Sequence, residues 1–403
     1  MTAPISEIWT LILAVLAIRL GILIHRLLPR LGAWNIPPAI TGGLLLALVV
    51  TLVRGAYGIE FAFADGIRQT LLLVFFVGVG LSAKFMALFR GGVGVAVVCL
   101  AILIAISLQN LAGVAIASGF GFNPALGLFM GSIPFLGGHG TAAAWAQAAA
   151  AQDLTGALEV GMAAATLGLI AGGLVAGPIA SRLIHRQFQG GQTASQPSRE
   201  HATASGQAPT HLTSAELLNS DRWLVITLVI ALCLALGELL RQWAAQHGLV
   251  VPGFLAVMLV AVILTNAADL LGHPVDTTVA ELTGTVALRL FLAISMMGLK
   301  LWELDAFIFP LLTSLAVQIL VVSAVALLLV YPLLGRGYEG AVAAGGFIGF
   351  AMGAMPVGLG VMRRMADRHG PAPRAMLAIT LAAALFADTA NALLVNLGFA
   401  WLG

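Results

Sequence analysis

Long apolar runs separated by short polar segments dominate the chain. A helix needs about 20 apolar residues to cross a hydrocarbon core roughly 30 Å thick. The pattern therefore predicts ten membrane-spanning helices, five in each half of the chain, and an all-α polytopic membrane protein. The predicted spans are 7–25, 36–54, 69–89, 93–119, 155–182, 222–245, 251–270, 286–304, 307–334 and 375–402.

Two further apolar stretches, 124–152 and 339–369, are too short for two crossings, and glycines interrupt both near their centres. Backbone that is not helical is tolerated at membrane depth only where protein or a water-filled cavity covers it. Each stretch therefore predicts a re-entrant hairpin of two half-helices whose tip lies at an interior site. The alternative is that the glycines only allow neighbouring helices to pack closely.

The two halves of the chain resemble each other in order and spacing. Gly131 and Gly138 of the first predicted hairpin recur, at the same separation, as Gly346 and Gly353 in the second. This pattern indicates an internal duplication. Because each copy has an odd number of spans, the second must cross the membrane in the opposite sense, as inverted repeats of secondary transporters do. The expected organisation is a first inverted repeat at 1–186, a linker at 187–220 and a second inverted repeat at 221–403.

Composition and charge agree with a membrane protein. The chain is 60% hydrophobic and 9% charged, with a mean hydropathy of +1.03, whereas soluble domains carry roughly 25% charged residues. Most Lys and Arg lie on one side if the N-terminus is outside, and the positive-inside rule then places both termini outside and the linker 187–220 in the cytoplasm. Nothing in the charge pattern indicates a nucleic-acid partner. The positively charged residues left outside are Arg54, Arg68, Arg241 and Lys300.

The tip of the first predicted hairpin has the chemistry of an anion site. Gly137, Gly138 and Gly140 allow a sharp turn and a close approach of backbone to ligand. The second arm is expected to begin at about Gly140–Thr141, so that its unpaired amides and positive dipole end face the tip and suit a carboxylate. In the second hairpin Pro356 takes the position of Thr141, and proline fits a first helical turn.

Three polar side chains accompany the first tip. His139 is the one histidine placed deep in the membrane, and binding substrate, carrying a proton or donating a structural hydrogen bond all remain open for it. Ser132 and Thr141 offer hydroxyl groups for a substrate or an ion. The alternative for both is a hydrogen bond back to their own helix.

Asp388 stands in the middle of the last span, with Asn391 one turn later. Placing an ionised carboxylate at that depth costs several kcal/mol unless a cation or a hydrogen-bond donor lies beside it. The Asp-x-x-Asn spacing places both oxygens on one helix face, which suits a hard cation such as sodium. A neutral, hydrogen-bonded structural aspartate is the alternative.

Several long strings resemble one family, the bacterial sodium/glutamate symporters. They are "IPPAITGGLLLAL", "SIPFLGGHGTAAAW", "ISMMGLKLWEL", and the region from "GFIGFAMGAMP" through "LFADTANALL". They follow the family's order over nearly the whole chain outside the linker. The resemblance implies a homodimer in the bacterial inner membrane that couples sodium to L-glutamate import, with a moving part that shifts against a scaffold.

The resemblance also assigns roles to individual positions. It places the substrate at the two hairpin tips and sodium at the polar pair of the last span. Met355, in "AMGAMP", departs from the family pattern, which has a smaller hydroxyl-bearing residue there, and the substrate is then glutamate or a similar small carboxylate. The substrate-binding candidates are Ser132, Gly137, Gly138, His139, Gly140, Thr141, Gly353, Met355 and Pro356, and the sodium candidates are Asp388 and Asn391.

Other functions remain as alternatives. A carrier of another small carboxylate, driven by sodium or by protons through His139, belongs to the same class. An ion channel is a different class and would need a continuous polar pore. An intramembrane enzyme would need a nucleophile paired with a base, or a set of metal ligands, and the spans predict neither, so no enzyme activity is expected.

Overall fold

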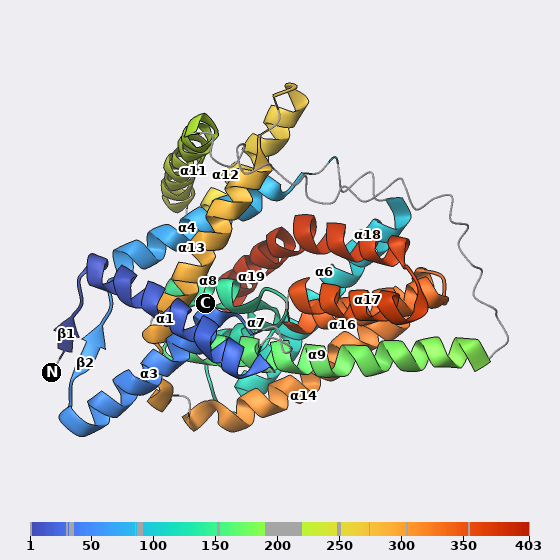
Figure 1. Ribbon diagram of the computed structural model, residues 1–403, viewed down its shortest axis with the longest axis horizontal. Helices are drawn as coiled ribbons and strands as arrows, with labels where there is room; N and C mark the ends of the chain where they lie inside the picture. The colour runs from blue at the N-terminus through green and yellow to red at the C-terminus, as the bar shows by residue number, and fades with distance from the viewer. Residues whose placement is uncertain are drawn as a thin grey trace.

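The computed structural model describes most of the chain as a bundle of helices (Figure 1). The residues that it describes are 2–29, 31, 36–84, 86, 92–150, 154–189, 220–247, 251–273, 275–303, 305–353 and 355–402. Nearly all of the predicted linker 187–220 lies outside them, as do the last residues of the stretch 124–152 and Ala354.

The elements follow one another along the chain as helices with short interruptions. In the first half they are β1 (Thr2–Pro4), α1 (Glu7–Leu27), α3 (Pro38–Tyr57), β2 (Glu60–Ala62), α4 (Asp65–Ser82), α6 (Gly92–Gly119), the 3-10 segment η1 (Pro124–Met130), α7 (Ser132–Phe135), α8 (Gly138–Ala150) and α9 (Ala157–Gln189). In the second half they are α11 (Ser220–Gln246), α12 (Gly253–Leu270), α13 (Thr277–Met297), the 3-10 segments η3 (Leu301–Glu303) and η4 (Asp305–Phe307), α14 (Ile308–Val325), the π-helical η5 (Ala326–Val330), α15 (Tyr331–Leu333), α16 (Tyr338–Gly353), α17 (Met355–His369), α18 (Pro373–Ala382), the π-helical η6 (Ala383–Ala387) and α19 (Asp388–Leu402).

Ten helices in the described residues are long and apolar enough to cross a membrane, as the sequence predicts. The largest boundary error is in the span predicted at 286–304, which is the helix Thr277–Met297. Asp276 caps its start by accepting a hydrogen bond from the Thr278 amide at 3.0 Å, and Gly298 follows its end. The polar first turns disguised this start, because span prediction relies on unbroken apolar sequence.

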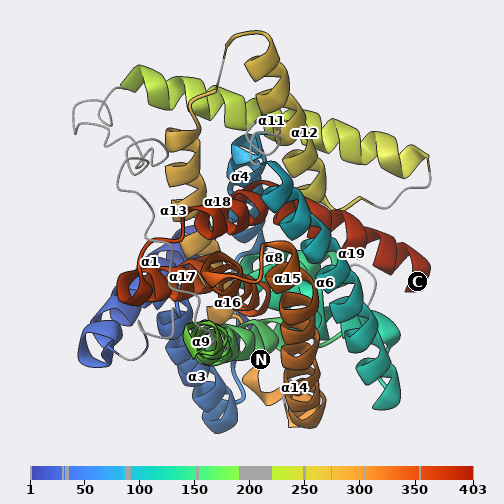
Figure 2. The same ribbon diagram turned by 90° about the vertical axis from the view of Figure 1, so that its right-hand side faces the viewer.

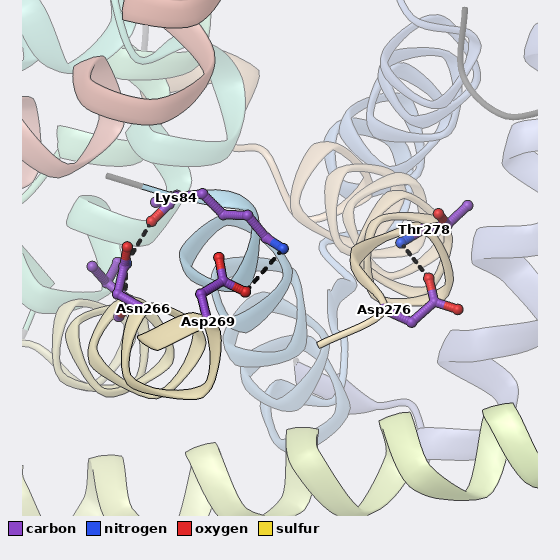
Figure 3. Close-up of polar contacts among 7 residues, drawn as sticks. Lys84, Asn266, Asp269, Asp276 and Thr278 are labelled. Atoms are coloured by element: carbon purple, nitrogen blue, oxygen red, sulfur yellow. Dashed lines mark hydrogen bonds and ion pairs between the residues drawn. The ribbon is translucent and has the colours of Figure 1, made fainter. Parts of the chain in front are cut away.

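Side-chain contacts fix the neighbouring ends of α4, α12 and α13 (Figure 3). Helix α4 ends at Ser82, seven residues before the end of the predicted span 69–89. Just beyond it, Asn266 Nδ2 donates to the Ala83 carbonyl at 2.8 Å, and Lys84 Nζ forms an ion pair with Asp269 Oδ1 at 3.3 Å. These contacts tie the chain after α4 to α12.

The helices pack as two groups, which lie on the left and the right of Figure 1. The frame group consists of α1, α3, α4, α11, α12 and α13. The hairpin group consists of α6, η1, α7, α8, α9 and the elements from α14 to α19. Each half of the chain contributes to both groups. In the view of Figure 2, α11 of the frame group and α14 of the hairpin group lie at opposite edges. Packing of α8 against α13, and of α19 against α12, joins the groups.

Both glycine-broken stretches are interrupted helices within the hairpin group. In 124–152 the first arm is not one half-helix, because a break at Gly131 divides it into η1 and the four-residue α7. The second arm, α8, begins at Gly138 rather than at about Gly140–Thr141, because Gly138 adopts a φ of 73°, which glycine tolerates best. In 339–369 the helices α16 and α17 pack against each other.

The all-α prediction needs one small correction. Strands β1 and β2 form a short parallel pair, with Thr2 opposite Glu60 and Pro4 opposite Ala62. The pair joins the N-terminus to the segment between α3 and α4. Apart from these strands, the regular structure in the described residues is helical.

Candidate functional site

A cavity of about 560 Å³ lies between the frame group and the hairpin group. The frame group contributes residues of α4 and α13, among them Phe75, Ser82, Glu281, Thr285 and Leu288. The opposite wall consists of the breaks in the two interrupted stretches, together with parts of α9, η6 and α19. The cavity is therefore bounded by both groups and by both halves of the chain.

The structure brings most of the predicted site residues to this cavity. Two helix N-termini meet it, those of α8 and of the 15-residue α17. The first amides of a helix lack helical partners, and the dipole adds positive potential there. The predicted residues that line the cavity are Gly137, Gly138, His139, Gly140, Gly353, Met355, Pro356 and Asp388.

Ser132, Thr141 and Asn391 are buried but do not line the cavity. Ser132 Oγ donates to Asn391 Oδ1 at 2.6 Å, and the Ser132 amide donates to Asn110 Oδ1 at 2.9 Å. This cluster connects the start of α7 to α19 and α6. Asn391 thus faces the interrupted helix, whereas Asp388 faces the cavity.

His139 is held by one neighbour on α9. Its Nε2 lies 3.0 Å from Thr166 Oγ1. The single proton of the Thr166 hydroxyl is donated to the Met162 carbonyl at 2.9 Å, so the threonine oxygen accepts from the histidine. The proton of a neutral His139 ring therefore lies on Nε2, and the ring is fixed at the start of α8.

Asp388 makes no hydrogen bond or ion pair with any residue that the structure describes, and its side chain is partly exposed to the cavity. No described Lys or Arg lines the cavity. The carboxylate is thus free to meet a cation that arrives from outside the protein, and the helix N-termini are the main positive features described there.

Ser82, Glu281 and Thr285 line the cavity but were not singled out from the sequence. Ser82 Oγ lies 3.1 Å from Glu281 Oε1, which joins the end of α4 to the second turn of α13. A sequence signal existed in the polar residues at the start of α13. The polarity of that segment resembles that of a loop before a later span, and this concealed it.

Comparison with known proteins identifies the family to which this chain belongs. The profile of the sodium/glutamate symporter family matches residues 4–371. The chain belongs to the sodium/glutamate symporter family. It is 33% identical to the sodium/glutamate symporter of Haemophilus influenzae, over 99% of this chain and 98% of the relative. It is 35% identical to the sodium/glutamate symporters of Escherichia coli and Shigella flexneri, over 96% of each chain.

Membership of this family, together with the ten membrane-length helices, makes the chain a multi-pass membrane transport protein. The family profile covers both interrupted stretches, which form one wall of the cavity. The similarity to the individual relatives extends over nearly the whole chain.

Replacing Gly138 is expected to abolish substrate binding without preventing membrane insertion. The change Gly138→Val puts a branched side chain at a φ of 73° in the cavity wall, where left-handed backbone strains a residue other than glycine by roughly 1–2 kcal/mol. Substrate-induced thermal stabilisation of the purified protein measures the loss. Gly177→Val on α9 is the matched control, because nothing lies within 4 Å of a Cβ built there. Full activity of Gly138→Val would remove this position from the site.

Proposed function

We propose that this chain is a sodium-coupled symporter that imports L-glutamate across the bacterial inner membrane. The family and the printed names of the relatives support the substrate and the ion. One observation on this chain's own structure supports the proposal most directly. Two helix N-termini and a carboxylate without a described partner face the same cavity.

The two helix N-termini supply the substrate site in this proposal. Free amides at the starts of α8 and α17 receive the substrate's carboxylates, as helix N-termini receive anions generally. Gly138 and Gly140 present backbone without side chains to the cavity, and the His139 ring contributes polar contact at the same tip. Met355 sets the width of the site beside Pro356, so its thioether decides how large a carboxylate fits.

Asp388 supplies the charge of the sodium site. A cation that neutralises this carboxylate makes the cavity more favourable for an anionic substrate, and this is the physical basis for coupling. Asn391 belongs to the same sodium region in this proposal. It accepts a hydrogen bond from Ser132 and so holds the start of α7 beside α19. Thr141, buried one turn into α8, supports the same tip.

In this proposal the chain consists of two inverted repeats, each with one re-entrant hairpin. In the proposal, 1–186 and 221–403 are the repeats, and the linker 187–220 joins them on the cytoplasmic side. Helices α1, α3 and α4 correspond to α11, α12 and α13, and α6 corresponds to α14. The hairpin 124–152 then corresponds to 339–369. The matching order of elements and the contribution of each half to both helical groups support it.

Transport in this proposal is elevator-like: the hairpin group moves against the frame group and carries the cavity across the membrane. With the N-terminus outside, Ser82 and Glu281 lie near the cytoplasmic ends of their helices. The cavity that they line then corresponds to a state open to the cytoplasm.

The proposed protein is a homodimer, as the resemblance to the family implies. Within the frame group, α11 contacts α12, α4 and α13 on one side. It exposes a row of apolar residues elsewhere, namely Leu224, Leu228, Leu232, Leu236 and Leu239. This face provides apolar surface for lipid or for a second subunit.

A single cysteine in the linker tests the topology. Ser205→Cys, with the native Cys99 and Cys233 replaced, should resist a membrane-impermeant maleimide added to intact cells, because the loop charges place the linker in the cytoplasm. Gln246→Cys, at the other end of α11, should react. Rapid labelling at position 205 from outside would show that the orientation is reversed.

Substrate competition tests the identity of the cargo. Uptake of radiolabelled L-glutamate into vesicles that contain the purified protein should be saturable and sodium-dependent, and excess unlabelled glutamate should compete most strongly. Stronger competition by another small carboxylate would reassign the substrate. Uptake that follows a proton gradient without sodium would favour the proton-coupled alternative. Non-saturable flux would favour a channel.

A further inference from the structure

Two glutamines lie fully buried in the hairpin group, Gln109 on α6 and Gln318 on α14. The two helices pack against each other. Neither side chain lines the cavity. Their hydrogen bonds nevertheless lead to both of the interrupted stretches that form it.

The bonds form a continuous relay between the two stretches. Gln318 Nε2 donates to the Met130 carbonyl at 3.0 Å, just before the break at Gly131, and to the Gln109 carbonyl at 2.9 Å. Gln109 Nε2 then donates to the Ala351 carbonyl at 3.0 Å. Both end points are carbonyls beside helix breaks, where helical hydrogen bonding ends.

The relay also crosses between the halves of the chain. Gln318, in the second half, holds the first interrupted stretch, and Gln109, in the first half, holds the second. Ser314, one turn before Gln318 on α14, adds another bond to the Met130 carbonyl at 2.6 Å. The two breaks are therefore linked through two side chains and the α6 backbone.

Stability alone does not account for these glutamines. The Oε1 atoms of Gln109 and Gln318 are both buried and have no hydrogen-bond partner in the described structure. A buried acceptor without a donor destabilises the fold, because it has lost its hydrogen bonds to water and gained none in return. An apolar side chain of the same length, such as methionine, would avoid that penalty.

We propose that Gln109 and Gln318 are positioning residues that set the two hairpin tips relative to each other. They tie the break at Gly131 to the last turn of α16, the segments that lead into α8 and α17, and so fix how far apart the starts of those two helices lie for the substrate. This inference rests on the proposed function for its substrate, but the relay itself concerns only the relative placement of the tips.

Three variants separate this role from a general structural one: Gln318→Met, Ser314→Ala and the double variant. In Gln318→Met the Met130 carbonyl keeps the bond from Ser314, so the protein should fold and its thermal stability should not fall. In the double variant that carbonyl loses both donors. Gln242→Met on the frame helix α11 is the matched control, because its glutamine is exposed and bonds only locally, to Glu238.

The expected result is a rise in KM for the transported substrate of about fivefold in Gln318→Met, with a smaller change in maximal rate. That factor corresponds to the net value of the one hydrogen bond that reaches the first hairpin, at the Met130 carbonyl. The double variant should exceed the product of the single effects. Wild-type uptake, measured first, tests the proposed function separately.

A distance measurement makes the test independent of transport. Spin labels at Ala150→Cys, at the end of α8, and at Arg364→Cys, on α17, report the separation of the two arms in a background without Cys99 and Cys233. The double variant should broaden the distance distribution, whereas Gln242→Met should leave it unchanged. An unchanged distribution in a folded double variant, or loss of folded protein in Gln318→Met, would overturn the proposal.

Discussion

Linking the two helical groups by a bridge between Gly140→Cys and Leu288→Cys is expected to reduce uptake to background. A Cβ built at Gly140 of α8 would lie 3.2 Å from Leu288 Cδ1 of α13, so a mercuric ion can bridge thiols at these two positions. An elevator movement requires α8 to slide past α13, and a covalent bridge between them prevents it. Uptake before and after mercuric treatment, and after reversal by excess dithiothreitol, measures the effect.

Both single-cysteine variants serve as controls, in a background without Cys99 and Cys233. Because Gly140 and Leu288 both line the cavity, each single variant measures how far its own substitution and one bound mercuric ion lower uptake. The double variant should lose the uptake that both single variants keep. Transport by the fully bridged protein would contradict rigid-body movement of the hairpin group against the frame group.

Asp388→Asn is expected to remove most of the sodium dependence of substrate binding. The substitution keeps the shape of the side chain but removes the charge that faces the cavity. Substrate affinity in the wild type should rise with sodium by a factor of about 5–150, the usual range for coupled sites. In the variant this factor should approach one. Substrate binding titrated across sodium concentrations, with potassium keeping the ionic strength constant, gives both values.

Asp305→Asn is the matched control, since that carboxylate is exposed and lies outside the cavity. Its sodium dependence should equal that of the wild type. An unchanged sodium dependence in Asp388→Asn would assign Asp388 to structure. Loss of substrate binding even at saturating sodium would instead place it in contact with the substrate.

The membrane-length helices were predictable because length and apolarity alone define them. The two interrupted stretches were predictable for a similar reason, since about 30 apolar residues exceed one span and are too few for two crossings. The start of α13 was not, because Thr277 and Glu281 make its first turns polar although they form regular helix. Helical turns that carry charged or polar residues because they line a cavity resemble a loop when only the sequence is considered.

The direction in which each side chain points was harder to predict. Asp388 and Asn391 stand one turn apart, and helix periodicity places them on one face. In the folded chain one faces the cavity and the other contacts Ser132, because α19 lies between the cavity and the start of α7. Only tertiary packing divides a single helix face in this way. Ser82 and Glu281 could not be predicted for the same reason. They lie far apart in the sequence and meet only in the folded chain.

The central claim is that a sodium gradient drives glutamate through this protein. The most direct measurement is the internal concentration of labelled L-glutamate in vesicles that contain the purified chain, with sodium outside and potassium inside. Transient accumulation above the external concentration is expected, and it should disappear when sodium is equal on both sides. Accumulation that is the same with and without the sodium gradient, or simple equilibration in both cases, would contradict it.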